Sequence, residues 1–222
     1  MINFREHSEM MEGVNDPSIF KAVFLAGGPG SGKSFVVGKT SLASLGFKII
    51  NSDTNYENSL KKAGLTMDAE DIFSAQGQAL RDKAKAITGK QLTLALKGRL
   101  GVVIDGTGKD YAKIKDNVDQ FRAVGYAVHM IFVNTDLETA LARNKSRDRV
   151  LPDEHVEKMW KSVQKNIGKF QGLFRNRMTV IDNSTDADIN TSTLEAYKDI
   201  QQWAKKPPEN SLAVKWIKGQ KK

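Results

Sequence analysis

The sequence contains no cysteine and only three histidines among its 222 residues. Without cysteine, the chain cannot form disulfide bonds, use a thiol in catalysis or bind zinc through sulfur. His7, His129 and His155 stand far apart, without the paired spacing of a metal site, so we interpret each as a structural or surface residue. The absence of cysteine therefore excludes thiol chemistry, and the three histidines do not indicate a metal site.

Long apolar runs are missing as well. No segment approaches the roughly 20 apolar residues that span a membrane, and the first residues lack the apolar core of a signal peptide. Only five residues are proline, while 40% are hydrophobic, which is enough for a folded core. We therefore expect a folded cytoplasmic protein with no membrane partner.

Basic charge is plentiful, and it is concentrated at one end of the chain. The net charge is +8, but residues 205–222 hold six lysines and one glutamate, a net +5 that leaves +3 for all the rest. A basic tail of this kind is typical of a nucleic-acid contact and equally of a solvated terminus. The charge alone leaves both interpretations open.

Short apolar segments alternate with helical patterns, which is typical of an α/β fold with a parallel sheet between two layers of helices. Strands are expected at 21–26, 47–50, 101–104, 127–133 and 178–181. Helices are expected over 33–45, 68–87, 110–124, 136–145, 153–171 and 194–204. The sequence therefore predicts a three-layer parallel sheet.

The domain organisation follows from these elements. We expect residues 1–20 to form an N-terminal extension, of which 1–18 are polar and peripheral and Ile19 and Phe20 are the anchor. Residues 21–204 are expected to form the main domain. The stretch 55–98 is too long for a simple crossover and predicts a helical insertion. After Pro207 and Pro208 we expect a mobile arm, the basic tail 205–222.

A glycine-rich segment joins the first strand to the first helix. It matches G-x-x-x-x-G-K-[ST] in full, and the flanking strand and helix are the context that this phosphate-binding motif requires. Lys33 is expected to reach the β- and γ-phosphates of ATP, and the Ser34 hydroxyl to bind Mg²⁺. The loop residues expected to hold the nucleotide are Gly28, Gly30, Ser31, Gly32, Lys33 and Ser34.

Two aspartates follow strands whose carboxyl ends should meet near this loop. Asp53 comes after the second strand and could act as the general base for an incoming hydroxyl, or could cap a helix. Asp105 closes the third strand, where a carboxylate orients Mg²⁺, usually through water, although Asp105 and Gly106 could also form a simple turn. The sequence leaves these alternatives open.

The chain resembles the P-loop kinases that include the kinase domain of bacteriophage polynucleotide kinase and the zeta toxins. The resemblance spans about residues 21–185 and is strongest between 100 and 167. It implies that Asp53 is the general base and that Asp105 and Thr107 face the acceptor and the phosphate. The chain departs from polynucleotide kinase at Tyr56, where that enzyme has a basic residue that helps hold the acceptor's 3′ phosphate.

The segment 143–152 is expected to form an arginine lid over bound ATP. The resembling family has lid arginines here, which favours Arg147 as the catalytic arginine and Arg143 as the residue that stacks on adenine, with Arg149 in reserve. A solvated surface turn is the alternative. After the fifth strand, Asn183 is a further candidate contact of the adenine ring.

The predicted activity is transfer of the γ-phosphate of ATP to a hydroxyl of a nucleic acid or nucleotide. The resemblance, the basic tail and the basic side chains beside the cleft favour it; these are Lys61, Lys62, Arg81, Lys83 and Lys85. A zeta-toxin-like kinase of a nucleotide sugar is the first alternative. The second is an ATPase or switch, which Gly106 disfavours because an ATPase more usually has a catalytic glutamate there.

Overall fold

The protein is described by a computed structural model that covers residues 14–40, 42–146, 150–184 and 188–221. Five parallel strands form one sheet in the order β2-β3-β1-β4-β5. Their bounds are β1 Lys21–Ala26, β2 Lys48–Ile50, β3 Val102–Asp105, β4 Ala127–Asn134 and β5 Met178–Asp182. The predicted all-parallel α/β sheet is confirmed, with β1 at its centre.

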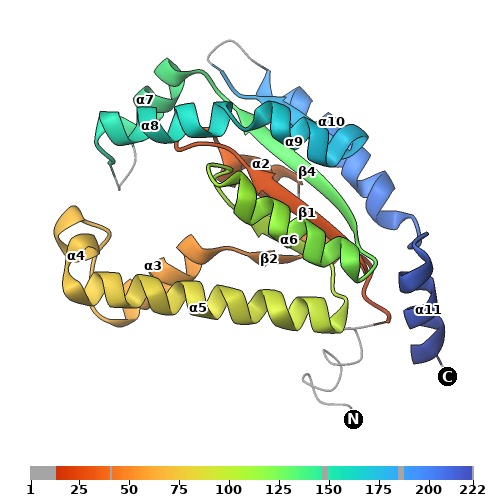
Figure 1. The fold of residues 1–222 in the computed structure, drawn as a ribbon. Coiled ribbons are helices and arrows are strands. Elements are labelled where there is room, and N and C mark those ends of the chain that lie inside the picture. Colours follow the sequence, from red (N-terminus) through yellow and green to blue (C-terminus); the bar gives the residue numbers. More distant parts are fainter. Residues whose placement is uncertain (1–13, 41, 147–149, 185–187, 222) are drawn as a thin grey trace.

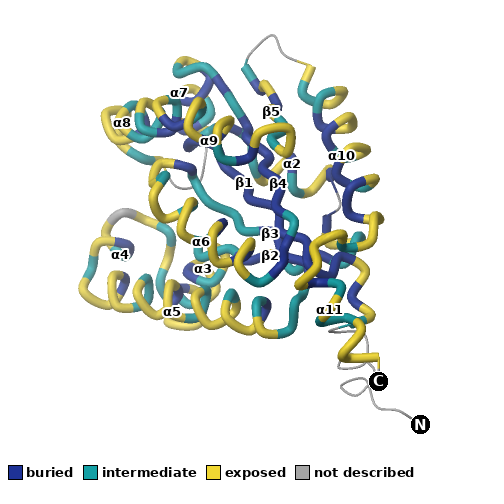
Figure 2. Tube along the Cα trace, turned by 45° about the vertical axis from the view of Figure 1, so that its right-hand side comes forward, coloured by how far each residue is buried: buried dark blue, intermediate teal, exposed yellow. Residues whose placement is uncertain are grey.

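Helices cover both faces of the sheet (Figure 1). They are α2 Lys33–Thr40, α3 Ser52–Lys62, α4 Ala69–Phe73, α5 Ala75–Gly98, α6 Tyr111–Ala123, α7 Leu137–Lys145, α8 Asp153–Gln164, α9 Ile167–Phe174, α10 Ile189–Lys205 and α11 Ser211–Gln220, with 3-10 turns at Leu42–Leu45 and Arg175–Arg177. Along β1, Ala22 and Phe24 pack toward α6 and α9, whereas Val23 and Leu25 pack toward α2 and α10. Alternating side chains thus fill two cores, and Figure 2 shows the buried strands between them.

The predicted insertion is a set of three helices with a small core of its own. Tyr56 and Leu60 of α3 pack with Ile72 of α4 and Ala84 of α5. The expected helix 68–87 is instead divided into α4 and α5, because Ser74 leaves the helical conformation and its hydroxyl caps α5. Long α5 then runs beside α3 along one side of the molecule (Figure 1).

The expected helix 153–171 is also divided, and the division lies at Asn166. Its buried side-chain amide donates hydrogen bonds to the carbonyls of Gly108 and Lys109, both at 3.0 Å. These contacts join the end of α8 and the start of α9 to the loop that follows β3. A periodic sequence pattern cannot show such a tertiary contact, so the break was not predicted.

The expectation of a mobile arm after Pro208 is wrong for the described residues. The residues after Asn210 form α11, in which Ala213 is fully buried and the Trp216 ring packs edge-on against Phe20, with 5.5 Å between ring centroids. Phe20 directly precedes β1, so α11 covers the amino end of the sheet. In the part of the chain that the structure describes, no helix is long and apolar enough to cross a bilayer.

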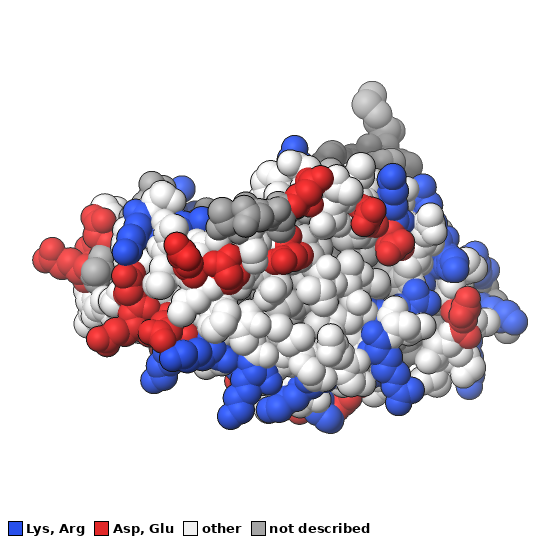
Figure 3. All heavy atoms as spheres, turned by 90° about the horizontal axis from the view of Figure 1, so that it is seen from above, with Lys and Arg blue, Asp and Glu red and all other residues white. Residues whose placement is uncertain are grey.

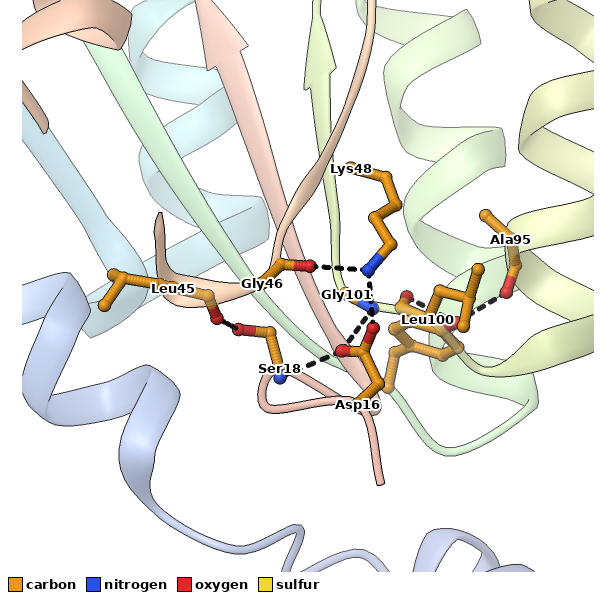
Figure 4. Close-up of polar contacts among 9 residues, drawn as sticks. Asp16, Ser18, Leu45, Gly46, Lys48, Ala95, Leu100 and Gly101 are labelled. Atoms are coloured by element: carbon orange, nitrogen blue, oxygen red, sulfur yellow. Dashed lines mark hydrogen bonds and ion pairs between the residues drawn. The ribbon is translucent and has the colours of Figure 1, made fainter. Parts of the chain in front are cut away.

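Among the described residues before β1, Asp16 and Ser18 are buried, not peripheral as the sequence predicted, while Asn15 and Pro17 are exposed. The Asp16 carboxylate has no exposed surface and accepts hydrogen bonds from the backbone N–H of Ser18 at 2.9 Å and of Gly101 at 3.3 Å. It also pairs with Lys48 Nζ at 2.9 Å (Figure 4). These contacts link the chain before β1 to the starts of β2 and β3.

Candidate active site

The glycine-rich loop lies between the end of β1 and the start of α2, as the motif requires. Gly30 and Gly32 have φ angles of +73° and +87°, the left-handed region that glycine adopts without a Cβ clash. Lys33, the first residue of α2, directs its Nζ back into the loop and donates to the carbonyls of Gly27 at 2.6 Å and Gly28 at 3.3 Å. The ammonium group therefore lies within the loop that should cradle phosphates.

Close packing fixes the loop from several sides. A Cβ on Gly30 would lie 2.6 Å from the Ala140 carbonyl oxygen of α7, and one on Gly32 would clash with the Asn183 amide. At Gly28, the nearest neighbour of a Cβ would be the Trp160 backbone of α8, 3.9 Å away. The glycines thus permit both the backbone turns and the contact with three separate segments.

Two serines of the loop have different surroundings. Ser31 is buried, and its hydroxyl has no hydrogen-bond partner among the described residues. Ser34, in the first turn of α2, is exposed. An exposed hydroxyl at this position is suited to binding Mg²⁺ beside a bound triphosphate.

Asn183 and Arg143 join the loop to the far side of the sheet. The Asn183 side-chain amide donates to the Ser31 carbonyl at 2.7 Å, while Arg143 donates to the Asn183 carbonyl at 2.9 Å and to its Oδ1 at 3.1 Å. A longer bond of 3.4 Å runs from Arg143 to the Gly30 carbonyl. The structure thus brings both predicted adenine contacts to the phosphate loop and binds them to each other.

Asp53 and Asp105 meet at the carboxyl ends of β2 and β3. Asn51 connects them, because its Nδ2 donates to Asp105 Oδ2 at 2.7 Å and its Oδ1 accepts from the Asp53 N–H at 2.7 Å. Asn51, not Asp53, therefore caps α3, and Asp53 lies exposed in the first turn of that helix. The capping interpretation of Asp53 is wrong, and its carboxylate is not used as the helix cap.

The charge of Asp105 depends on its neighbours. Burial raises the pKa of its carboxyl above the ordinary value of 3.8, Lys33 lowers it, and the nearby Asp53 raises it. Lys33 and Asp53 therefore both lie near enough to Asp105 to change the pKa of its carboxyl. Lysine on one side and two carboxylates on the other are the charges that phosphoryl transfer needs.

Thr107 lies in the loop after β3 and contacts the phosphate loop through its backbone. Its carbonyl accepts a hydrogen bond from the Gly27 N–H at 3.1 Å, and its hydroxyl accepts only a long bond, 3.5 Å, from the Lys109 N–H. Thr107 is half-buried. The structure therefore places it beside the phosphate loop.

Tyr56 and Arg81 form a contact that the sequence did not predict. The Tyr56 ring is buried one turn after Asp53, and the Arg81 guanidinium of α5 lies over it, with 5.3 Å between the guanidinium carbon and the ring centroid. The Tyr56 hydroxyl has no partner among the described residues. α5 therefore supplies a cation next to the position where α3 has an aromatic ring.

The segment 143–152, predicted to form a lid, lies only partly within the described residues. Arg147 and Arg149 lie outside them, so the predicted catalytic arginine is not located. On either side of that gap, Asn144 forms two bonds with the Leu151 backbone, donating at 2.7 Å and accepting at 3.1 Å. Since Asn144 is fully buried, these bonds fasten the two ends of the lid to each other.

A magnesium ion would find oxygen donors at this site. Among the described residues there is no cluster of three or more acidic or histidine side chains that could enclose a metal. Magnesium with a nucleotide needs less, because phosphate oxygens and water fill most of its positions. The Ser34 hydroxyl and the Asp105 carboxylate fit that requirement.

A family model described as "AAA domain" matches residues 23–166, well over half of the chain. The matched segment contains the phosphate loop, Asp53 and Asp105. A search of curated proteins finds no match.

Solved structures share the fold across most of the chain. A gluconokinase from Sinorhizobium meliloti is 16% identical with a TM-score of 0.52, covering 83% of this chain and 95% of its own. The PezAT toxin-antitoxin system of Streptococcus pneumoniae contains a chain that is 14% identical with a TM-score of 0.56, covering 90% and 92%. A chain of the Pnkp1/Rnl/Hen1 RNA repair complex is 21% identical with a TM-score of 0.53, covering 68% and 46%. The protein therefore has a P-loop kinase-like fold.

Proposed function

The chain belongs to the AAA-domain family, and from this premise we propose that it is an ATP-dependent kinase that phosphorylates a hydroxyl of a nucleotide or nucleic acid. The observation that carries the proposal is the position of Asp53, which is exposed at the end of β2 and relieved of helix capping by Asn51. An available carboxylate beside a phosphate loop indicates phosphoryl transfer to a second substrate.

In the proposed reaction, Asp53 accepts the proton of the acceptor hydroxyl as its oxygen attacks the γ-phosphorus of ATP. The bond from that phosphorus to the bridging oxygen breaks, and ADP leaves. Lys33 and an arginine of the lid, Arg147, stabilise the charge that develops on the transferred group. A magnesium ion bound by Ser34 and Asp105 would neutralise phosphate charge.

Support for a nucleotide acceptor comes from the insertion. Arg81 of α5 stacks on Tyr56, which lies one helical turn beyond Asp53 in α3. Its guanidinium could bind a phosphate of the acceptor there. The basic tail does not add to this support, because α11 packs on Phe20 at the opposite end of β1 from the phosphate loop. Seen from above, acidic and basic side chains are both present on the surface (Figure 3).

A kinase of a nucleotide sugar is the second candidate, and the compact insertion favours it. α3, α4 and α5 pack around a core of their own beside Asp53, an arrangement suited to enclosing a small acceptor.

Transfer of labelled γ-phosphate distinguishes these candidates. The panel contains 5′-hydroxyl oligonucleotides, hydroxymethylated DNA, nucleosides, nucleoside monophosphates and UDP-sugars. We expect label on a nucleotide or nucleic acid. Label on a UDP-sugar alone would establish the second candidate, and steady ATP hydrolysis with no labelled acceptor would establish an ATPase instead.

Asp53→Asn tests the general base. We expect kcat to fall about 10²–10⁴-fold, because the amide cannot accept the proton, while the Kd for ATP stays nearly unchanged. Glu57→Gln, one turn later on the exposed face of α3, is the matched control and should keep its rate. Normal transfer by Asp53→Asn would show that another group is the base.

A further inference from the structure

A second cavity opens at the amino end of the sheet, far from the phosphate loop. Its volume is about 310 Å³, and its walls come from the starts of β1 and β4, the end of α10 and the linker before α11. Lys21 and Trp203 line it, together with Arg177, Lys206 and Glu209. Because β1 separates Lys21 from the phosphate loop by six residues, the two sites are roughly 20 Å apart.

Lys21 is the unusual residue of this cavity. It is only 4% exposed, and its Nζ lies 5.1 Å from the centre of the Trp203 ring. Among the described residues, no carboxylate lies within ion-pair distance of it and no oxygen accepts a hydrogen bond from it. The side chain is mostly buried while the residue lines the cavity, so an anion bound in the cavity would give the ammonium a partner that the described residues do not supply.

The other charges around the cavity have the same sign. Arg122, Arg177 and Lys206 line it with Lys21, against the single carboxylate of Glu209, so the lining carries a net charge of +3. Burial lowers the pKa of Lys21; Glu209 raises it, and Arg177 and Lys206 lower it further. The cations thus repel one another in the free protein, and an anion between them would relieve that repulsion.

We propose that this basic cavity is a second ligand site that binds a small phosphorylated molecule, with Lys21 and Arg177 on the phosphate and the Trp203 ring as an apolar wall. The volume suits a small molecule better than a nucleic-acid strand. Several cations around one cavity match the charge of a phosphate dianion or a diphosphate. This site does not depend on the proposed kinase activity.

Inorganic pyrophosphate is the probe, titrated calorimetrically into the full chain. The phosphate loop is also expected to bind phosphates, so the titration uses Lys33→Met as the parent protein. NaCl keeps the ionic strength constant. We expect saturable binding that weakens roughly 10- to 100-fold in Lys21→Met, because a charged hydrogen-bonding partner is lost. Arg177 is exposed, so Arg177→Met should fold normally and should also weaken binding.

Lys198→Met is the matched control, since Lys198 is an exposed lysine on the same helix as Trp203 but outside the cavity. It should bind pyrophosphate as the parent does. Unchanged affinity in both Lys21→Met and Arg177→Met, or no saturable binding, would overturn the proposal. So would a Lys21-dependent affinity for a single-stranded oligonucleotide alone, which would make the cavity a nucleic-acid contact.

Discussion

The amino and carboxyl ends of the sheet differ in whether their polar and charged groups have partners within the protein. At the amino end, Asp16 is fully buried and the protein itself satisfies its carboxylate with two backbone N–H groups and Lys48. At the carboxyl end, Asp53 and Ser34 are exposed and the Ser31 hydroxyl has no partner among the described residues. A charge that the fold satisfies stabilises the fold, whereas groups left available are suited to bind a ligand.

Lys21 is the exception that makes this comparison useful. It is buried like Asp16, yet no described carboxylate pairs with it. By the same criterion it belongs with the ligand-binding groups, although it lies at the amino end. The predictions below separate effects on activity from effects on stability, starting with the largest expected effect.

Lys33→Met should abolish most activity and leave the fold intact. We expect the rate of phosphoryl transfer to fall about 10²–10³-fold, because a preorganised cation no longer stabilises the transferred group. The free energy of unfolding should change by only about 1 kcal/mol, since the lysine donates hydrogen bonds to the loop carbonyls of Gly27 and Gly28. Lys39→Met, exposed on the same helix, is the control for both measurements.

A large loss of stability in Lys33→Met would break the comparison. It would mean that the groups at the carboxyl end hold the fold together as Asp16 does. Urea unfolding measured beside the transfer assay distinguishes the two results.

Asp16→Ala should lower the stability of the fold and leave ATP binding unchanged. Removing the carboxylate leaves two backbone N–H groups and Lys48 without their acceptor, so we expect a loss of roughly 2–4 kcal/mol in the free energy of unfolding. The Kd for ATP should stay the same at temperatures where the variant is folded. Asp199→Ala, at an exposed position of α10, should cost little. An Asp16→Ala protein as stable as the parent would show that this segment is peripheral after all.

His129 should make stability depend on pH. Burial, with Arg177 nearby, lowers the pKa of His129 from 6.5 to about 4. Between these values the unfolded chain binds a proton that the folded chain does not, so stability falls as the pH drops from about 6.5 to 4. One pKa unit corresponds to about 1.4 kcal/mol, which gives a loss of up to about 3 kcal/mol.

Urea unfolding at several pH values measures this effect. His129→Gln should flatten the pH dependence in that window, whatever its effect on stability at pH 7. His155→Gln, at an exposed site, should leave the slope as it is. An unchanged slope in His129→Gln would assign the pH dependence to other groups.

Local patterns in the sequence were enough to predict the parallel sheet and the phosphate loop. Apolar runs alternating with helical periods specify strands and helices, and the glycines and Lys33 of the loop act through the backbone next to them. The same local reasoning failed after Pro208. There α11 is held by packing on Phe20, a residue far away in the sequence, which a local pattern does not show.

The sequence by itself thus determined the fold class and the position of the glycine-rich loop between β1 and α2. Only the tertiary structure decided which residue caps α3, that Arg143 and Asn183 bind each other beside the loop, and that Arg81 lies over Tyr56. The last two contacts join residues many positions apart, and Asn51 is held by Asp105, 54 positions away. A sequence pattern carries only the spacing between neighbours. The sequence likewise could not show that Lys21 is buried without an ion-pair partner among the described residues. Its burial depends on α10 and the linker before α11, which cover the start of β1.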